Sequence, residues 1–277
     1  WHAQSDWSFV ADAAANPRPV SRLMNFGDSG IELELRRSDY FMMVRTVYTA
    51  EELLEFLSNW NIDALILTGI LNQDFYEQLK TQPAPFLLVD SEVHDESRMQ
   101  VHLKDREGGL MATRHLISLG HERILFCGPA PMEEGVIKER LMGYRQALQE
   151  AGLPFVQERL LLSPMGIREA ADLGRALALR DDFTAIFATA DVLAAGIMAG
   201  LQNAGRRIPE DISVIGFDDL PVAQLTVPQL TTIRQDVVQR GRAAVRMLLS
   251  SLAGKKPDNI TFPVELVQRG STGPARR

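Results

Sequence analysis

Residues 211–236 read DISVIGFDDLPVAQLTVPQLTTIRQD, and this stretch decides the fold of the chain. It opens with an almost wholly apolar run, residues 212–217, that is rich in β-branched side chains. Such a run is typical of a strand covered on both faces, as in a parallel sheet. Two acids, Asp218 and Asp219, follow at once. Because ligands of open parallel sheets bind outside the carboxyl ends of the strands, these carboxylates predict a binding site for a polar small molecule.

A second interpretation of the two acids is structural. Asp side chains often accept hydrogen bonds from the backbone of a following turn, and here Leu220 and Pro221 make such a turn. This alternative weighs equally with ligand binding for Asp219 and less for Asp218.

Composition limits the classes of protein to consider. With 277 residues and 45% hydrophobic content, the chain is long enough for two moderate domains. Its single cysteine, Cys127, excludes an intramolecular disulfide and a cysteine metal cluster, which fits a reducing compartment. No apolar stretch approaches membrane-spanning length and no secretory signal opens the chain, so we expect a cytoplasmic protein with no membrane partner. The net charge of -7 argues against this chain binding nucleic acid by itself.

Short apolar runs alternate with helical periodicity, which is typical of βαβ units. We expect strands near residues 7–11, 40–47, 64–68, 86–90, 101–103, 124–127, 160–162, 185–188, 212–217 and 260–267. We expect helices near residues 17–31, 50–57, 75–79, 105–119, 141–148, 168–179, 191–204 and 237–252. Asp105 is placed to cap its helix, and Gly120 to end it in the left-handed conformation. The pattern restarts at His121, which predicts an α/β fold of two small doubly wound parallel sheets.

Two blocks of sequence carry a family resemblance. The first has VIGFDD at 214–219, PQLTTI at 228–233, and QD at 235–236 before a helix with Gly241. The second has DREG at 105–108, HL at 115–116 and LGHERI at 119–124. As a set, they resemble the ligand-binding, periplasmic-binding-protein-like domain of LacI/GalR-family transcription regulators, over roughly residues 8–272.

The resemblance implies a division into two subdomains. The helix at 237–252 then packs back on the first half, so that the chain crosses between the halves three times. One subdomain is expected from residues 1–120 plus 237–262, and the other from 121–236 plus 263–277. Three crossings would make a hinge around a cleft that closes over a ligand.

Site residues follow from the resemblance one by one. Arg140, three residues before Gly143, matches the Arg by which the family holds ligand hydroxyls or carboxylates, and Asp218 matches its ligand-binding acid. The alternative for Arg140 is a surface ion pair with Glu139 or Glu133. Further positions implied to line the cleft are Asp90, Gln235, Asp12, Asn16 and Asp191. We expect Asp218→Asn and Arg140→Ala to abolish binding with little effect on the unliganded protein.

Three departures from the family pattern concern the ligand. Ala190 stands where the family often has an Asn amide. Arg18 and approximately Gly166 stand where many members place aromatic rings. The stacking expected for a pyranose is therefore weaker, and Arg18 near the cleft mouth would favour an anionic ligand. The interpretation that Arg18 simply faces solvent is equally open.

The function implied is effector sensing and dimerisation in a LacI-type regulator. The ligand is expected to be a sugar or sugar derivative first, and a nucleobase-like or acidic compound second. Operator DNA would be bound only through an N-terminal domain absent from this chain, and the protein would be a homodimer with much of its interface in the first subdomain. The rival from another class is an exported solute-binding protein of a sugar transporter, because the start at Trp1 leaves both histories open.

Enzyme classes are disfavoured by the motifs. The chain has no Gly-x-Ser-x-Gly elbow, no phosphate-binding Gly-x-x-x-x-Gly-Lys loop, and no Gly-x-Gly-x-x-Gly after the first strand. None of its five His has a convincing metal-ligand spacing, so we expect no cofactor and no metal. A hydrolase that uses Asp218 and Asp219 stays open as a minor alternative.

Overall fold

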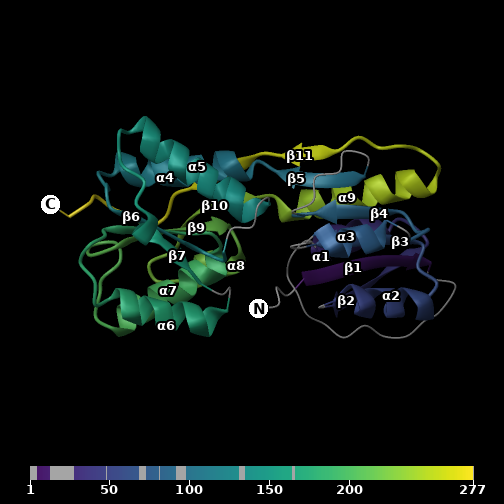
Figure 1. The fold of residues 1–277 in the computed structure, drawn as a ribbon, viewed down its shortest axis with the longest axis horizontal. Helices are drawn as coiled ribbons and strands as arrows, with labels where there is room; N and C mark the ends of the chain where they lie inside the picture. The colour runs from purple at the N-terminus through teal and green to yellow at the C-terminus, as the bar shows by residue number, and fades with distance from the viewer. Residues whose placement is uncertain are drawn as a thin grey trace. The chain divides into compact units, whose positions relative to one another are not determined.

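The chain divides into two compact units. A computed structural model describes residues 5–12, 28–47, 49–68, 73–80, 82–91, 98–130, 135–163 and 166–276 (Figure 1). Unit 1 comprises Trp1–Leu103 and Asp236–Phe262, and unit 2 comprises Lys104–Gln235 and Pro263–Arg277. The chain therefore passes from one unit to the other three times.

A six-stranded sheet forms the centre of unit 1, in the order β11-β5-β4-β3-β1-β2. Its strands are β1 (Ser5–Asp12), β2 (Tyr40–Val47), β3 (Ala64–Thr68), β4 (Phe86–Val89), β5 (Met99–Leu103) and β11 (Ile260–Phe262). The pairs β3–β4, β4–β5 and β5–β11 are parallel, whereas β1 runs antiparallel to both β2 and β3. The predicted α/β fold with parallel sheets is confirmed. In unit 1, β1 is an antiparallel exception, since the apolar pattern of a strand does not encode its direction.

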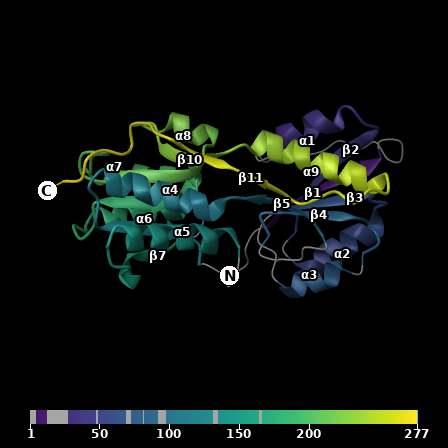
Figure 2. The same cartoon turned by 90° about the horizontal axis from the view of Figure 1, so that it is seen from above.

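Helices cover both faces of this sheet. They are α1 (Asp28–Leu35), α2 (Ala50–Asn59), α3 (Gln73–Leu79) and α9 (Val237–Leu252). Figure 2 shows α9 beside α1, where Ile31 and Leu248 share one apolar cluster. Leu53 and Tyr76 belong to the cluster on α2 and α3. Thr49 caps α2, because its Oγ1 accepts a hydrogen bond of 3.2 Å from the Glu52 N–H.

Unit 2 is built on a second six-stranded sheet, in the order β12-β10-β9-β8-β6-β7. Its strands are β6 (Ile124–Gly128), β7 (Leu160–Leu162), β8 (Ala185–Ala188), β9 (Ser213–Asp218), β10 (Thr231–Gln235) and β12 (Val264–Val267). Only β12 among them pairs antiparallel. The closing strand predicted at 260–267 is in fact two strands, because β11 and β12 belong to different sheets and Pro263, which lacks an N–H, lies between them.

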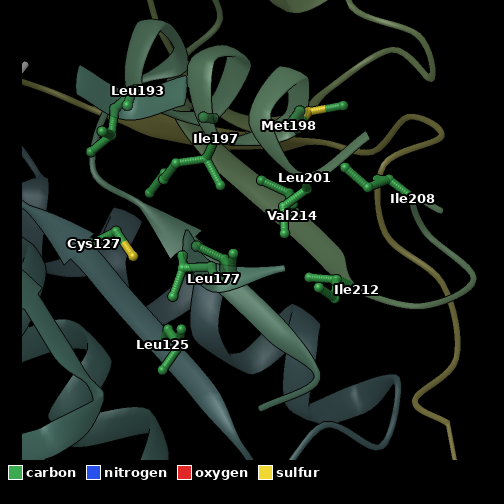
Figure 3. Packing of buried hydrophobic residues seen from close by; sticks show 14 of the residues in the cluster. Leu125, Cys127, Leu177, Leu193, Ile197, Met198, Leu201, Ile208, Ile212 and Val214 are labelled. Carbon is green, nitrogen blue, oxygen red and sulfur yellow. The ribbon is translucent and has the colours of Figure 1, made fainter. Parts of the chain in front are cut away.

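One face of the second sheet carries α6 (Ile167–Leu177) and α7 (Asp191–Asn203). Figure 3 shows Leu125, Cys127 and Val214 of the sheet in one cluster with Ile197 and Leu201 of α7. All five side chains are fully buried. Burying one side chain of this size contributes about 1.5–3 kcal/mol, so this cluster holds the strands that present the site.

The other face carries α4 (Asp105–Ser118) and α5 (Val136–Glu150), which approach very closely. A Cβ atom on Gly109 would lie 2.2 Å from the Arg140 carbonyl oxygen, and one on Gly143 would lie 2.1 Å from that of Arg106. Only glycine fits at these two positions, and α4 consequently belongs to unit 2. The predicted boundary after Gly120 was therefore wrong, since the restart of the pattern at His121 marks a strand inside unit 2.

Candidate functional site

The end of β9 brings two acids to the carboxyl edge of the sheet in unit 2. Asp218 and Asp219 have φ angles of 112° and 58°, a region that residues with a Cβ rarely adopt. Strained backbone of this kind persists only where its surroundings hold it, and it is frequent at functional sites. Asp218 is 8% exposed, so its carboxylate depends on partners from the protein.

Arg140 is the cation that lies beside Asp218. Its Nε donates to Asp105 Oδ1 at 2.8 Å, its Nη1 donates to the Thr189 carbonyl at 2.5 Å, and its Nη2 lies 3.8 Å from Asp218 Oδ1. The guanidinium also stacks on Phe217, with 3.5 Å from Cζ to the ring centroid. Four contacts hold the fork of donors in one orientation, which is what recognition of a hydroxyl or carboxylate requires.

Asp105 was predicted only as a helix cap, and that interpretation was wrong. The helix α4 begins at Asp105 itself, with Lys104 at the N-cap position and no side-chain cap bond there. The buried Asp105 carboxylate instead meets Arg140 of the neighbouring helix. The two residues are 35 apart in sequence, so no local pattern could have paired them.

Gln235 completes the group of predicted residues that the structure brings together. It ends β10, the neighbour of β9, and its Nε2 donates to Asp218 Oδ1 at 2.6 Å. Asp218, Arg140 and Gln235 thus present an acceptor, a cationic donor and an amide at one edge. A polar metabolite with several hydroxyl groups needs such a mixture of donors and acceptors.

Asp191 is a buried residue whose hydrogen bonds hold the segment after β9 and strand β10. Its side chain is fully buried, and its two oxygens accept hydrogen bonds from the Leu220 N–H at 2.7 Å and from Thr232 Oγ1 at 2.5 Å. Burial, followed by the charge of Asp218, raises the pKa of Asp191 to about 8, and the two hydrogen bonds oppose this only in part. It is therefore Asp191 that caps the turn after β9, a role predicted for Asp218 or Asp219.

Asp219 points into a separate ion network. Its oxygens accept hydrogen bonds of 2.6 Å from Arg234 Nε and from Arg269 Nη2, and Arg234 reaches on to Glu265. The two consecutive acids therefore engage different partners. This arrangement does not form the paired carboxylates that a glycosidase uses, in which both acids flank one bond.

Three other predicted residues belong to the range of unit 1. Asp90 follows β4 with a φ of 53° and forms an ion pair with Arg240 of α9, which is 5% exposed. Asp12 ends β1, where it pairs with Tyr40. Asn16 and the unusual Arg18 lie outside the described residues.

Two negative findings hold for the described part of the chain. Its His, Cys, Asp and Glu residues form no group that could hold a metal ion. None of its helices combines the length and the apolar character that crossing a membrane requires.

Comparison with known proteins gives consistent matches. The periplasmic binding protein-like domain family matches residues 113–272. The HTH-type transcriptional regulator MalR of Streptomyces coelicolor is 33% identical over 239 residues, which cover 82% of this chain and 69% of the relative. A LacI family transcriptional regulator from Enterococcus faecium, solved with bound ribose, has a TM-score of 0.79 and 30% identity, with 90% of this chain and 94% of that chain covered.

A further solved structure agrees. The complex of the transcriptional regulator CelR with cellobiose has a TM-score of 0.79 and 27% identity, with 88% of this chain and 77% of that chain covered. These relatives are transcription regulators, and they do not favour the alternative of a transporter's solute-binding protein. The chain belongs to the LacI/GalR family of transcriptional regulators and has the periplasmic-binding-protein-like fold of their ligand-binding domain.

Proposed function

We propose that this domain senses a small polar metabolite, a sugar or sugar derivative, and that binding changes the affinity of the regulator for its operator. The observation that carries the proposal is the group of Asp218, Arg140 and Gln235 at one edge of the sheet in unit 2. Asp218 would accept bonds from ligand hydroxyls, while Arg140 would donate to ring or hydroxyl oxygens.

Relatives support the sugar class. One solved regulator holds ribose and another holds cellobiose. These ligands share vicinal hydroxyl groups, which suit a carboxylate with two acceptor oxygens and a planar guanidinium. DNA contact is assigned to a reader segment outside the residues described, since the relatives are HTH-type regulators and this chain carries a net charge of -7.

A thermal-shift screen tests the proposal. The panel contains ribose, cellobiose, other sugars, sugar phosphates, nucleosides and organic acids. A compound present at about a hundred times its Kd stabilises the fold by about 2.7 kcal/mol, which moves Tm by several degrees. Asp218→Asn should remove the shift, whereas Asp172→Asn, an exposed acid on α6, should keep it. A panel without any hit, or a full shift in Asp218→Asn, would reject the site.

We also propose a homodimer that uses α8 (Pro221–Leu225) of unit 2. Leu225 and Val227, two residues apart in sequence, are 78% and 79% exposed, and exposed large apolar side chains favour this surface as an interaction site. The palindromic operators of such regulators call for paired readers. Part of the interface would then lie in unit 2, in addition to the part expected from the first subdomain.

Sedimentation at tens of micromolar tests the dimer. The wild type should sediment as a dimer, and the double variant Leu225→Glu, Val227→Glu should shift toward monomer. Leu179→Glu is the matched control, because Leu179 is 86% exposed but lies beyond the end of α6. A monomeric wild type would reject the proposal, and an unchanged dimer in the double variant would reject this interface.

A further inference from the structure

One buried hydroxyl in unit 2 makes no hydrogen bond with the described residues. Thr189 follows β8, at the same carboxyl edge as Asp218, and its side chain is fully buried. Among the atoms of the described residues, Thr189 Oγ1 has no hydrogen-bond partner. A buried hydroxyl without a partner destabilises a fold, so its presence calls for a compensating function.

The surroundings of Thr189 connect it to the candidate site. Its carbonyl oxygen is the acceptor for Arg140 Nη1, so the residue lies directly against the guanidinium. Its side chain packs over the end of β6, where a Cβ atom on Gly128 would come within 2.4 Å of Thr189 Oγ1. A glycine at 128 thus makes room for this hydroxyl.

The residue after Thr189 offers no polar group of its own. Ala190 has no polar side-chain group, so the turn between β8 and α7 offers a hydroxyl at 189 and no amide at 190. A Thr hydroxyl donates one hydrogen bond and accepts two, which matches the hydroxyl group of a sugar. Its β-branched side chain has few rotamers, so little freedom is lost when it binds.

We propose that Thr189 is a specificity-determining residue whose hydroxyl hydrogen-bonds a hydroxyl group of the metabolite held by Arg140 and Asp218. This inference rests on the proposed function. Ligands that lack a hydroxyl group at this point would leave the Thr189 hydroxyl unsatisfied and would bind less tightly.

Substitution of Thr189 separates binding from folding. Thr189→Val replaces the hydroxyl by a methyl group of similar shape, and Thr189→Ser keeps the hydroxyl. The control is Thr113→Val, which removes a buried hydroxyl that does have a partner, the Gly109 carbonyl at 2.8 Å. Calorimetric titrations use ribose, cellobiose and the strongest binder from the panel above.

We expect Thr189→Val to raise Kd about tenfold or more while the unliganded Tm stays level or rises. Thr189→Ser should remain close to the wild type in affinity, and Thr113→Val should lower the unliganded Tm without changing Kd. Wild-type affinity in Thr189→Val would overturn the inference and leave the proposed function intact. A wild type that binds none of the probes would instead overturn the proposed function, and this inference with it.

Discussion

In both units, an acid with a positive φ follows a central strand, but the contacts that hold this acid differ between the units. In unit 1, Asp90 follows β4 with a positive φ and pairs with Arg240 of a covering helix. In unit 2, Asp218 follows β9 with a positive φ and lies near Arg140 of a covering helix. The side chain of Asp90 is 33% exposed, whereas that of Asp218 is 10% exposed. The acid of unit 2 therefore depends far more on its protein partners.

In unit 2, several side chains share the contacts at this strand end. Arg140 serves two buried acids, Asp105 and Asp218, and Gln235 adds a hydrogen bond to the second. A charge held in this way is preorganised, so little rearrangement is needed when a ligand arrives. A strand-end acid with an Arg thus occurs in both units, and the deeper burial of Asp218 favours unit 2 for the proposed binding edge.

The largest effect is expected from Arg140→Ala. Removing this guanidinium takes a cation away from two buried carboxylates, which costs about 3–5 kcal/mol. The expectation that this substitution spares the unliganded protein does not fit the buried pairing. Urea unfolding measures the change, and hydrogen exchange should rise in peptides of unit 2. Arg36→Ala, at an exposed i,i+4 pair of unit 1, is the control and should stay within about 1 kcal/mol.

A smaller effect is expected from the matched substitution Arg240→Ala in unit 1. It removes the cation that pairs with Asp90, an acid exposed enough to be hydrated again, so the cost should be about 1–2 kcal/mol. Hydrogen exchange should rise in peptides of unit 1, around β4 and α9. Equal losses in the Arg140 and Arg240 variants would contradict the difference in support between the two units.

The sequence predicted those features of the two strand ends that depend on residues adjacent in the chain. Apolar runs followed by acids placed Asp90 and Asp218 at strand ends, and the family motif identified Arg140. The pairing of Arg140 with Asp105 joins two helices across a close glycine contact, and local periodicity carries no information about it. The same contact draws α4 into unit 2, which is why the boundary after Gly120 was misplaced.

Other features depend on the fold as a whole. Asp219 meets Arg269 at a separation of 50 residues, so the sequence left its role open between ligand contact and turn cap. Asp191 was implied as a ligand contact by the family resemblance. Its actual surroundings, the Leu220 N–H and Thr232, come from the segment after β9 and from β10. The sequence around the start of α7 carries no information about these distant partners, so it could not show that Asp191 would be enclosed by them.

The smallest change in stability at acidic pH is expected from Asp191→Asn. The difference in stability between this variant and the wild type should grow as pH rises. Burial raises the pKa of Asp191 to about 8 in the fold, against 3.8 for an ordinary Asp. The unfolded chain therefore releases this proton at lower pH than the folded chain does. The contribution of Asp191 to stability must fall as pH rises from about 4 to about 8.

An Asn at 191 resembles the protonated acid, since it can accept from the Leu220 N–H and donate to Thr232 Oγ1. The variant should match the wild type within about 1 kcal/mol at pH 5 and be the more stable protein at pH 8. Urea unfolding at both pH values measures this. Asp211→Asn is the control with the opposite sign, because the hydrogen bond from Arg207 lowers the pKa of Asp211 to about 2. Stability curves of wild type and Asp191→Asn that stay parallel from pH 5 to 8 would show that Asp191 is ionised in the fold, and the binding edge would then carry one more negative charge beside Asp218.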